Sequence, residues 1–151
     1  MAAAVAIIII VTASLAVLRP WQTRLILSDE DSGRQLLTLP MTEGNRFSVT
    51  YTHSVHQTPV TEVYEVRGND IYVVEARFYT FGAGMQTDYP EGVTLTYAED
   101  GAIVLTGYNT LCPTLVYGVG RIADFTLSYG NEEYPLAELD GRGKFIEFTV
   151  K

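Results

Sequence analysis

The chain has 151 residues, of which 47% are hydrophobic and 19% are charged. This length suits one domain, and this balance of residues excludes a disordered chain. The formal net charge of -8 repels phosphate groups, so we expect no nucleic acid partner. The single cysteine, Cys112, excludes an intrachain disulfide and a Cys-x-x-Cys zinc pattern, and we interpret it as a small buried residue.

The N-terminal run from Ala2 to Leu18 carries no charged residue. As a helix it would be about 26 Å long, slightly shorter than a hydrocarbon core of about 30 Å, yet it exceeds the apolar region of a usual signal peptide. Trp21 follows where an interfacial aromatic residue belongs. We therefore interpret residues 1–20 as a membrane anchor or signal segment and residues 21–151 as a β domain.

Three interpretations of this run stay open. An uncleaved anchor is favoured over a signal cleaved near Ser14-Leu15-Ala16, since no Lys or Arg precedes the run; a buried core helix is the third. Arg19 and Arg24 follow the run, and by the positive-inside rule alone they would place the domain in the cytoplasm. The β-rich domain and the N-terminal position of the run favour export. We expect a single-pass protein of the cytoplasmic membrane with an extracytoplasmic β domain, or a secreted or periplasmic protein if the segment is cleaved.

From Arg24 onward, short runs of apolar and aromatic residues alternate with turn residues. Phe47, Val49 and Tyr51 alternate with hydroxyl residues, a period of two that predicts a half-buried strand. Gly68-Asn69-Asp70 and Glu99-Asp100-Gly101 predict two hairpin turns. The pattern predicts an all-β fold, an antiparallel sandwich or barrel of about nine or ten strands. The expected strands are Arg24–Ser28, Gln35–Leu39, Arg46–Thr52, Pro59–Arg67, Ile71–Thr80, Thr94–Tyr97, Ala102–Thr106, Phe125–Tyr129, a short strand at Tyr134, and Ile146–Val150.

The densest polar stretch runs from Thr52 to Pro59 and holds both histidines of the chain, His53 and His56, with Ser54 and Thr58. A metal site would draw on the two histidines with Glu62 or Glu75, although the spacing matches no established zinc pattern. A Ser54-His pair could supply a nucleophile, and Glu62 with Glu75 could act as acid and base. Non-catalytic recognition by the loop is a fourth possibility, and a strand corner held by its own hydrogen bonds is the structural alternative. We expect no catalytic residue, no bound metal and no cofactor.

Two further features bear on a site. Glu62 is spaced by two residues along one predicted strand with Val60, Tyr64 and Val66, and Glu75 is spaced by two along the next with Ile71, Val73 and Arg77. Residues at this spacing lie on the same face of a strand, so we expect both carboxylates to share a face with apolar residues. Such a group needs a partner, for which His53 or Arg77 is available. Gly82 and Gly84 allow a tight turn or a close backbone approach, and no helix pattern follows them as a phosphate cradle would require.

Three stretches in combination resemble a known family: Tyr51-Thr52-His53-Ser54-Val55, Thr58-Pro59-Val60-Thr61-Glu62 and Phe78-Tyr79-Thr80-Phe81-Gly82-Ala83-Gly84. They are similar to a bacterial domain-of-unknown-function family of small anchored β proteins, often found beside TAXI-type TRAP transporters. The resemblance runs from about Leu25 to the C-terminus. It implies a small extracytoplasmic β domain near a transporter, and it assigns no roles to the matching residues His53, Ser54, Glu62, Gly82 and Gly84.

We therefore expect a non-enzymatic, extracytoplasmic accessory protein of a TRAP-type solute uptake system. Its partners would be the membrane subunits or the solute-binding protein of the transporter, and residues 2–18 would contact the membrane. The binding residues of this hypothesis are His53, Ser54, His56, Thr58, Glu62, Glu75, Gly82 and Gly84. An independent small-molecule-binding β module is the alternative, and a metal-dependent enzyme is the second alternative.

Overall fold

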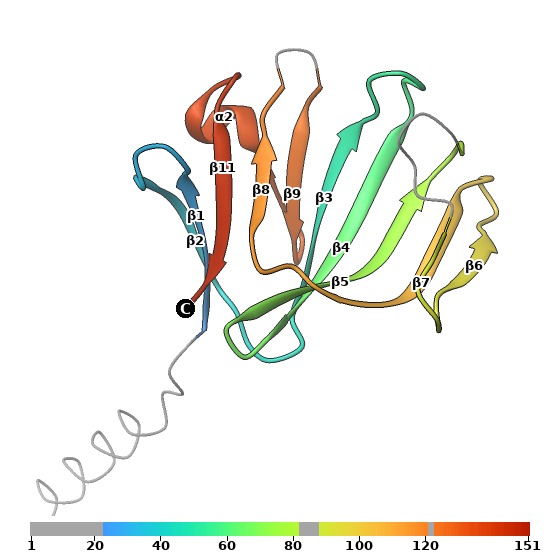
Figure 1. Ribbon diagram of the computed structural model, residues 1–151. Coiled ribbons are helices and arrows are strands. Elements are labelled where there is room, and N and C mark those ends of the chain that lie inside the picture. Colours follow the sequence, from blue (N-terminus) through green and yellow to red (C-terminus); the bar gives the residue numbers. More distant parts are fainter. Residues whose placement is uncertain (1–22, 82–87, 121–122) are drawn as a thin grey trace, which may run out of the picture.

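Eleven strands and one short helix make up the described part of this computed structural model, residues 23–81, 88–120 and 123–151 (Figure 1). The expected N-terminal helix lies outside these residues, and no helix within them is long and apolar enough to cross a membrane. The elements are β1 (Arg24–Asp29), β2 (Gln35–Pro40), β3 (Arg46–Thr52), β4 (Pro59–Arg67), β5 (Asp70–Phe78), β6 (Thr94–Tyr97), β7 (Ile103–Leu111), β8 (Leu115–Gly118), β9 (Phe125–Tyr129), β10 (Glu132–Pro135), α2 (Leu136–Asp140) and β11 (Phe145–Val150).

The strands form two antiparallel sheets. A four-stranded sheet has the order β2-β1-β11-β8, and a seven-stranded sheet has the order β10-β9-β3-β4-β5-β7-β6. The last strand, β11, lies between β1 and β8, so both ends of the described chain meet in the smaller sheet (Figure 1). The prediction of an all-β fold is confirmed. Of the sandwich and the barrel that were predicted as alternatives, the structure shows two separate sheets and no closed barrel.

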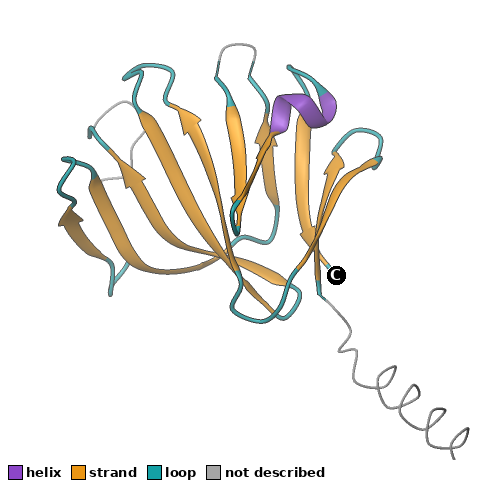
Figure 2. Cartoon of the chain, turned by 180° about the vertical axis from the view of Figure 1, so that it is seen from behind, coloured by secondary structure: helices purple, strands orange, loops and turns teal. Residues whose placement is uncertain are grey.

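The predicted strand count of nine or ten is too low. The strand that the pattern missed is β8, whose sequence Leu115-Val116-Tyr117-Gly118 is a short apolar run without a polar alternation. Helix α2 was also unpredicted because five residues are too few for a helical period. It follows β10 and covers one end of the sandwich (Figure 2). Both predicted hairpins are confirmed, with Gly68 and Gly101 at positive φ in the turns.

The main core lies between the two sheets. From the smaller sheet, alternate residues such as Leu25, Leu27, Ile146 and Phe148 point inward and are almost fully buried. From the larger sheet, Phe47 stacks on Tyr64 with ring centroids 5.2 Å apart and on Phe148 at 6.0 Å. The two sheets are thus joined by aromatic stacking, which adds to the apolar area that both inner faces bury.

A second core lies on the larger sheet, on its inner face over β4, β5 and β7. Val60, Phe78, Ile103 and Leu105 are buried there, and the described residues that pack in this cluster include none from the smaller sheet. The chain that leads into β6 packs against it instead, through residues such as Tyr89 and Val93 (Figure 1). This core is therefore covered by an irregular segment and not by a sheet.

Gly107 makes the close approach of that segment possible. It lies in β7 with a φ of +85°, and a Cβ at this position would stand 2.4 Å from the carbonyl oxygen of Gly92. No side chain fits at that distance, so the absence of a Cβ lets residues 92 and 93 lie directly on β7.

Candidate functional site

The predicted polar segment forms the loop between β3 and β4, and its own groups close it. The backbone N–H of His53 donates to the carbonyl of Thr58 at 2.8 Å, and that of Gln57 donates to the carbonyl of His53 at 2.9 Å. The Nδ1 atom of His53 accepts the backbone N–H groups of Val55 and His56, both at 3.3 Å. These bonds satisfy backbone groups at a strand corner, as the structural alternative requires.

The loop also brings the two histidines together. Their rings stack with centroids 5.0 Å apart, whereas an extended strand would point them to opposite faces. The Nε2 atom of His56 is buried without a hydrogen-bond partner in the described structure. At the tip, Val55 is 64% exposed, and the side chain of Gln57 donates to the carbonyl of Ser54 at 2.6 Å. Recognition through this loop stays a prediction.

Glu62 does not join the histidine loop, because it lies on the inner face of β4. The predicted face with Val60, Tyr64 and Val66 is confirmed, and all three of these neighbours are buried. The expected partners His53 and Arg77 do not bond it. Instead its Oε2 atom accepts the hydroxyl of Tyr117 at 2.5 Å and that of Tyr64 at 3.1 Å.

The two phenols also contact each other, with their oxygens 2.6 Å apart. Burial, together with the nearby charge of Glu62, raises the pKa of Tyr64 and of Tyr117 far above the usual value, and it raises the pKa of Tyr51 to about 12. The phenols therefore stay protonated at neutral pH and act as donors. The two phenols thus hold the carboxylate of Glu62 between the sheets, since Tyr64 belongs to the larger sheet and Tyr117 to the smaller one.

Glu75 is placed differently from the prediction. The register between β4 and β5 shifts at Val74, and that between β5 and β7 shifts there too, so a β-bulge breaks the alternation of β5. Glu75 pairs with Val63 and Thr106 on the outer face, away from Glu62. The expectation that Glu75 shares a face with Ile71 and Val73 is wrong, and Arg77 pairs with Asp100 instead.

The predicted glycines Gly82 and Gly84 lie outside the described residues. Of the predicted site residues, the structure therefore brings together His53, Ser54, His56 and Thr58, and it separates them from Glu62 and Glu75. No group of three His, Cys, Asp or Glu side chains within the described part of the chain could hold a metal ion.

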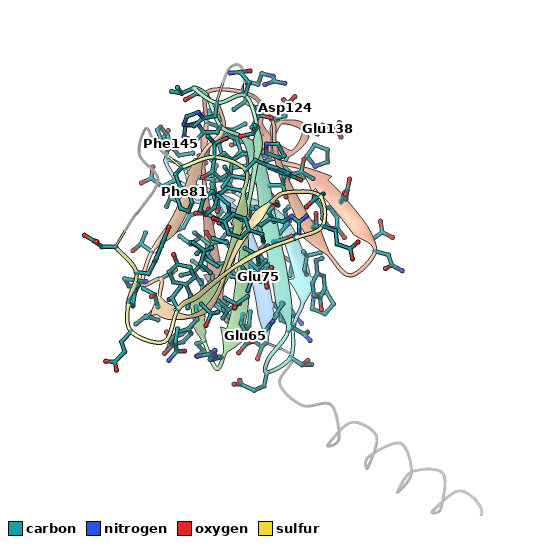
Figure 3. All side chains as sticks on the ribbon, turned by 90° about the vertical axis from the view of Figure 1, so that its right-hand side faces the viewer. Glu65, Glu75, Phe81, Asp124, Glu138 and Phe145 are labelled. Atoms are coloured by element: carbon teal, nitrogen blue, oxygen red, sulfur yellow. The ribbon has the colours of Figure 1, made fainter. Side chains whose placement is uncertain are left out.

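A surface that sequence reasoning missed lies at the free edge of the larger sheet. All four residues of β6 are exposed, and β7 is the one strand that pairs with β6 in the described part of the chain. Leu95 and Tyr97 stand on the inner face opposite Leu105 and Ile103, and they are 37% and 71% exposed. Phe81, also exposed, packs its ring edge against Phe78 of the second core (Figure 3). We call the exposed side chains of Phe81, Leu95 and Tyr97 with the free backbone edge of β6 the β6 surface.

Residues 47–136 match a family described as a domain of unknown function (DUF1850). The chain belongs to this family. The DUF1850 segment runs from β3 to the start of α2, so it contains the histidine loop, the Glu62 cluster and the β6 surface. Strands β1, β2 and β11 lie outside it. Comparison with curated proteins and with solved structures finds no match.

A carboxyl pair lies outside the DUF1850 segment, where β1 ends beside α2. Asp29 accepts the side chain and the backbone N–H of Ser32, and its Oδ2 lies 3.6 Å from Nζ of Lys144. Asp140 is bonded by Arg34, and both aspartate side chains are about 95% buried. The hydroxyl of Ser32 lowers the pKa of Asp29, and the hydrogen bond from Asp140 lowers it further. That same bond, with burial, raises the pKa of Asp140. The two carboxyl groups therefore shift in opposite directions, the pKa of Asp29 downward and that of Asp140 upward.

A shallow polar depression lies on the outer face of the DUF1850 segment. Its volume is about 220 Å³, and it is open to solvent above β3, β9 and β10. Half of its lining residues are threonine or serine, and two carboxylates also line it, of which Asp124 is bonded by Arg142. The lining residues are Thr50, Tyr51, Thr52, Pro59, Asp124, Thr126, Ser128 and Glu133.

Proposed function

We propose that this protein is a non-catalytic accessory protein of a TRAP-type solute uptake system, and that it works outside the cytoplasmic membrane by binding another protein. The observation that carries the binding part is the β6 surface. A free edge strand with exposed aromatic and aliphatic side chains offers both backbone hydrogen bonds and apolar area to a partner. The transporter part is supported by the resemblance of the three stretches around His53, Glu62 and Phe81.

The chemistry of the interior agrees with a binding role. Glu62, a partly buried carboxylate on the inner face of β4, is held by two protonated phenols. The histidine loop is closed by its own hydrogen bonds and leaves Val55 exposed at its tip. Both features stabilise the scaffold from which the β6 surface and the loop tip project. The segment 2–18 would hold this scaffold at the membrane.

The experiment is a pull-down of tagged full-length protein from its native membranes in mild detergent, with every partner identified by mass spectrometry. We expect stoichiometric recovery of transporter membrane subunits or of the solute-binding protein. A strain that lacks the transporter genes supplies the control for non-specific recovery. If the protein is recovered alone, or with the same proteins in both strains, the accessory function is wrong.

A second candidate function rests on the polar depression. Hydroxyl groups with two carboxylates in the lining suit a polyol or a cationic amino compound, and the carboxylates disfavour organic anions. In a thermal-shift screen of sugars, amino acids and organic acids, a binding module gains stability with its ligand. We expect sugars or basic amino acids to raise the Tm and organic acids to leave it unchanged. A Tm that no compound raises would exclude the small-molecule function for these classes.

A further inference from the structure

Among the described residues, no strand pairs with the backbone of β6 on the side away from β7. The N–H of Ala98 donates to the carbonyl of Ala102 at 2.8 Å, which fixes the hydrogen-bonded pairs of this antiparallel ladder. Counting back by two residues, Thr96 and Thr94 face β7, and Leu95 and Tyr97 direct their N–H and C=O groups outward. This edge therefore presents two backbone N–H donors and two backbone C=O acceptors.

Within its four residues, β6 lacks the charged side chains, prolines and bulges that protect many edge strands, although its short length is itself a partial protection. Natural edge strands are guarded by charged residues, prolines or bulges within the strand. The sequence of β6 is Thr-Leu-Thr-Tyr, and its pairing with β7 runs without a register shift. Leu95 and Tyr97 lie on one face beside the second core, so an incoming strand with alternate apolar side chains would extend that core.

The charge around β6 determines which kind of strand can pair with its edge. Glu91 precedes the strand and Glu99 follows it, and both are exposed. Neither forms an ion pair within the described residues, whereas the next acidic residue, Asp100, is bonded by Arg77 and Tyr79. A second copy pairing antiparallel would bring the acidic ends of one β6 beside those of the other, which is unfavourable. A segment with basic ends would meet opposite charge at both ends.

We propose that β6 binds an extended segment of a partner protein by strand addition, and that this segment has alternate apolar side chains and Lys or Arg at its ends. This inference rests on the proposed binding function and gives the chemistry of its partner. The partner strand pairs with the backbone of Leu95 and Tyr97, lays its apolar side chains beside theirs, and places its basic ends near Glu91 and Glu99.

The test uses full-length protein in detergent with two synthetic peptides, Lys-Val-Thr-Val-Thr-Val-Lys and the same peptide with Glu at both ends. We expect the basic peptide to bind about tenfold more tightly than the acidic peptide at low salt. Hydrogen exchange is expected to show new protection of the Leu95 and Tyr97 amides, with no change at Thr94 and Thr96. Equal binding of the two peptides, or no protection at these amides, overturns the proposal.

A pair of variants separates the backbone bond from the side chain. Leu95→Pro removes the outward N–H and keeps the ladder to β7, since an edge strand tolerates proline where its N–H faces solvent. Leu95→Ala shortens the side chain and keeps the N–H. We expect the Pro variant to lose peptide binding and the Ala variant to keep part of it. Equal binding by both variants, or a dimer of the wild-type protein that Leu95→Pro abolishes, overturns the proposal.

Two further measurements keep the result unambiguous. If Leu95→Pro does not fold, the double variant Glu91→Gln with Glu99→Gln must lose the preference for the basic peptide, and a retained preference overturns the charge argument. In the pull-down from native membranes, recovery of transporter subunits by both wild type and Leu95→Pro leaves the accessory function standing and rejects strand addition. Failure of the wild type to recover them rejects the accessory function, and the peptide experiment still decides strand addition.

Discussion

The two halves of the seven-stranded sheet are covered in different ways. Over β9, β3 and β4, the four-stranded sheet supplies a second layer, and Phe47 of one sheet stacks on Phe148 of the other. Ile71 and Val73, at the start of β5, still belong to this main core. From Ala76 onward and over β7, the cover includes Tyr89 and Val93 of an irregular segment, and the residues of β6 are exposed. The main core therefore contains interdigitating side chains from two sheets. The second core has a sheet on one side only.

Under the proposed binding function, this difference would separate stability from recognition within one sheet. A core between two sheets cannot collapse when a side chain is shortened, because both backbones are held by their ladders. A core beneath a single segment can relax more easily, and its free edge is available to another chain. We therefore expect mutations in the first half to cost more stability, and mutations at the β6 surface to act on binding.

The largest effect is expected in the main core. Phe47→Ala removes a ring that stacks between Tyr64 and Phe148, and we expect it to lower the free energy of unfolding by about 3–5 kcal/mol. Phe78→Ala in the second core is the matched variant, with a cost near the lower end of that range or below it. Urea denaturation of both variants measures the difference. Equal costs would mean that the segment over β7 holds its core as firmly as a sheet does.

The next effect concerns the close approach at Gly107. Gly107→Ala places a Cβ 2.4 Å from the carbonyl oxygen of Gly92, so the segment must lift away from β7. Gly101→Ala is the matched control, since its φ of +82° is similar and no atom lies within 4 Å of its Cβ. We expect about 1–2 kcal/mol for the control from backbone strain alone, and about 1–3 kcal/mol more for Gly107→Ala from overpacking. Similar costs for the two variants would show that the segment at Gly92 can move away from β7 without a loss of stability.

The Glu62 cluster gives a smaller effect. Tyr117→Phe removes the hydroxyl that contacts both Glu62 and Tyr64, and it leaves the partly buried carboxylate with one donor. We expect a cost of about 1–3 kcal/mol. Tyr64→Phe is the comparison, and its cost should be smaller because its contact with Glu62 is longer, at 3.1 Å. Urea midpoints in the reverse order would contradict the assignment of Tyr117 as the main donor.

The smallest effect is a pH dependence from the carboxyl pair. The hydrogen bond to Asp29 raises the pKa of Asp140, so its contribution to stability is complete below the ordinary pKa of 3.8 and is lost as the pH rises to the folded-state value. The pKa of Asp29 is lowered, mainly by Ser32, so its contribution is present above its ordinary pKa and is lost as the pH falls through the folded-state value.

Two amide variants test this assignment. Asp140→Asn keeps a donor toward Asp29 at every pH, so we expect it to abolish the loss of stability on the alkaline side of pH 3.8. Asp29→Asn removes the acceptor of two Ser32 bonds and the partner of Lys144, so we expect it to lower the Tm at pH 7 by several degrees. Thermal melts from pH 3 to pH 8 measure both. If the Tm of Asp29→Asn did not depend on pH and Asp140→Asn kept the pH dependence of the wild type, the roles assigned to the two aspartates would be wrong.

Much of the fold was predictable because strands with one buried face alternate. The alternation of β3 and the turns at Gly68 and Gly101 follow from local patterns of two to four residues. The alternation failed at Val74, where a single extra residue moved Glu75 to the outer face. A bulge leaves no signal in an apolar strand such as Ile-Tyr-Val-Val, because both faces of the pattern stay apolar.

The candidate sites were predictable only in part. The dense polar residues of the histidine loop predicted a corner, and the inward position of Glu62 followed from Val60, Tyr64 and Val66. Its partner Tyr117 is 55 residues away on β8 and belongs to the other sheet. A hydrogen bond between sheets depends on how the layers face each other, and no local pattern contains that information.

By itself, the sequence determined the all-β class, most of the strands, two hairpin turns and the burial of Glu62, because each depends on residues close along the chain. Tertiary structure alone decided that β11 pairs with β1 and β8, that Glu62 bonds two phenols, and that the larger sheet extends beyond the smaller one to a free edge at β6. These features arise from the packing of distant segments. The physical reason is that the alternation of residues along a strand indicates which face is buried. The strands that pair with it depend on contacts summed over the whole fold.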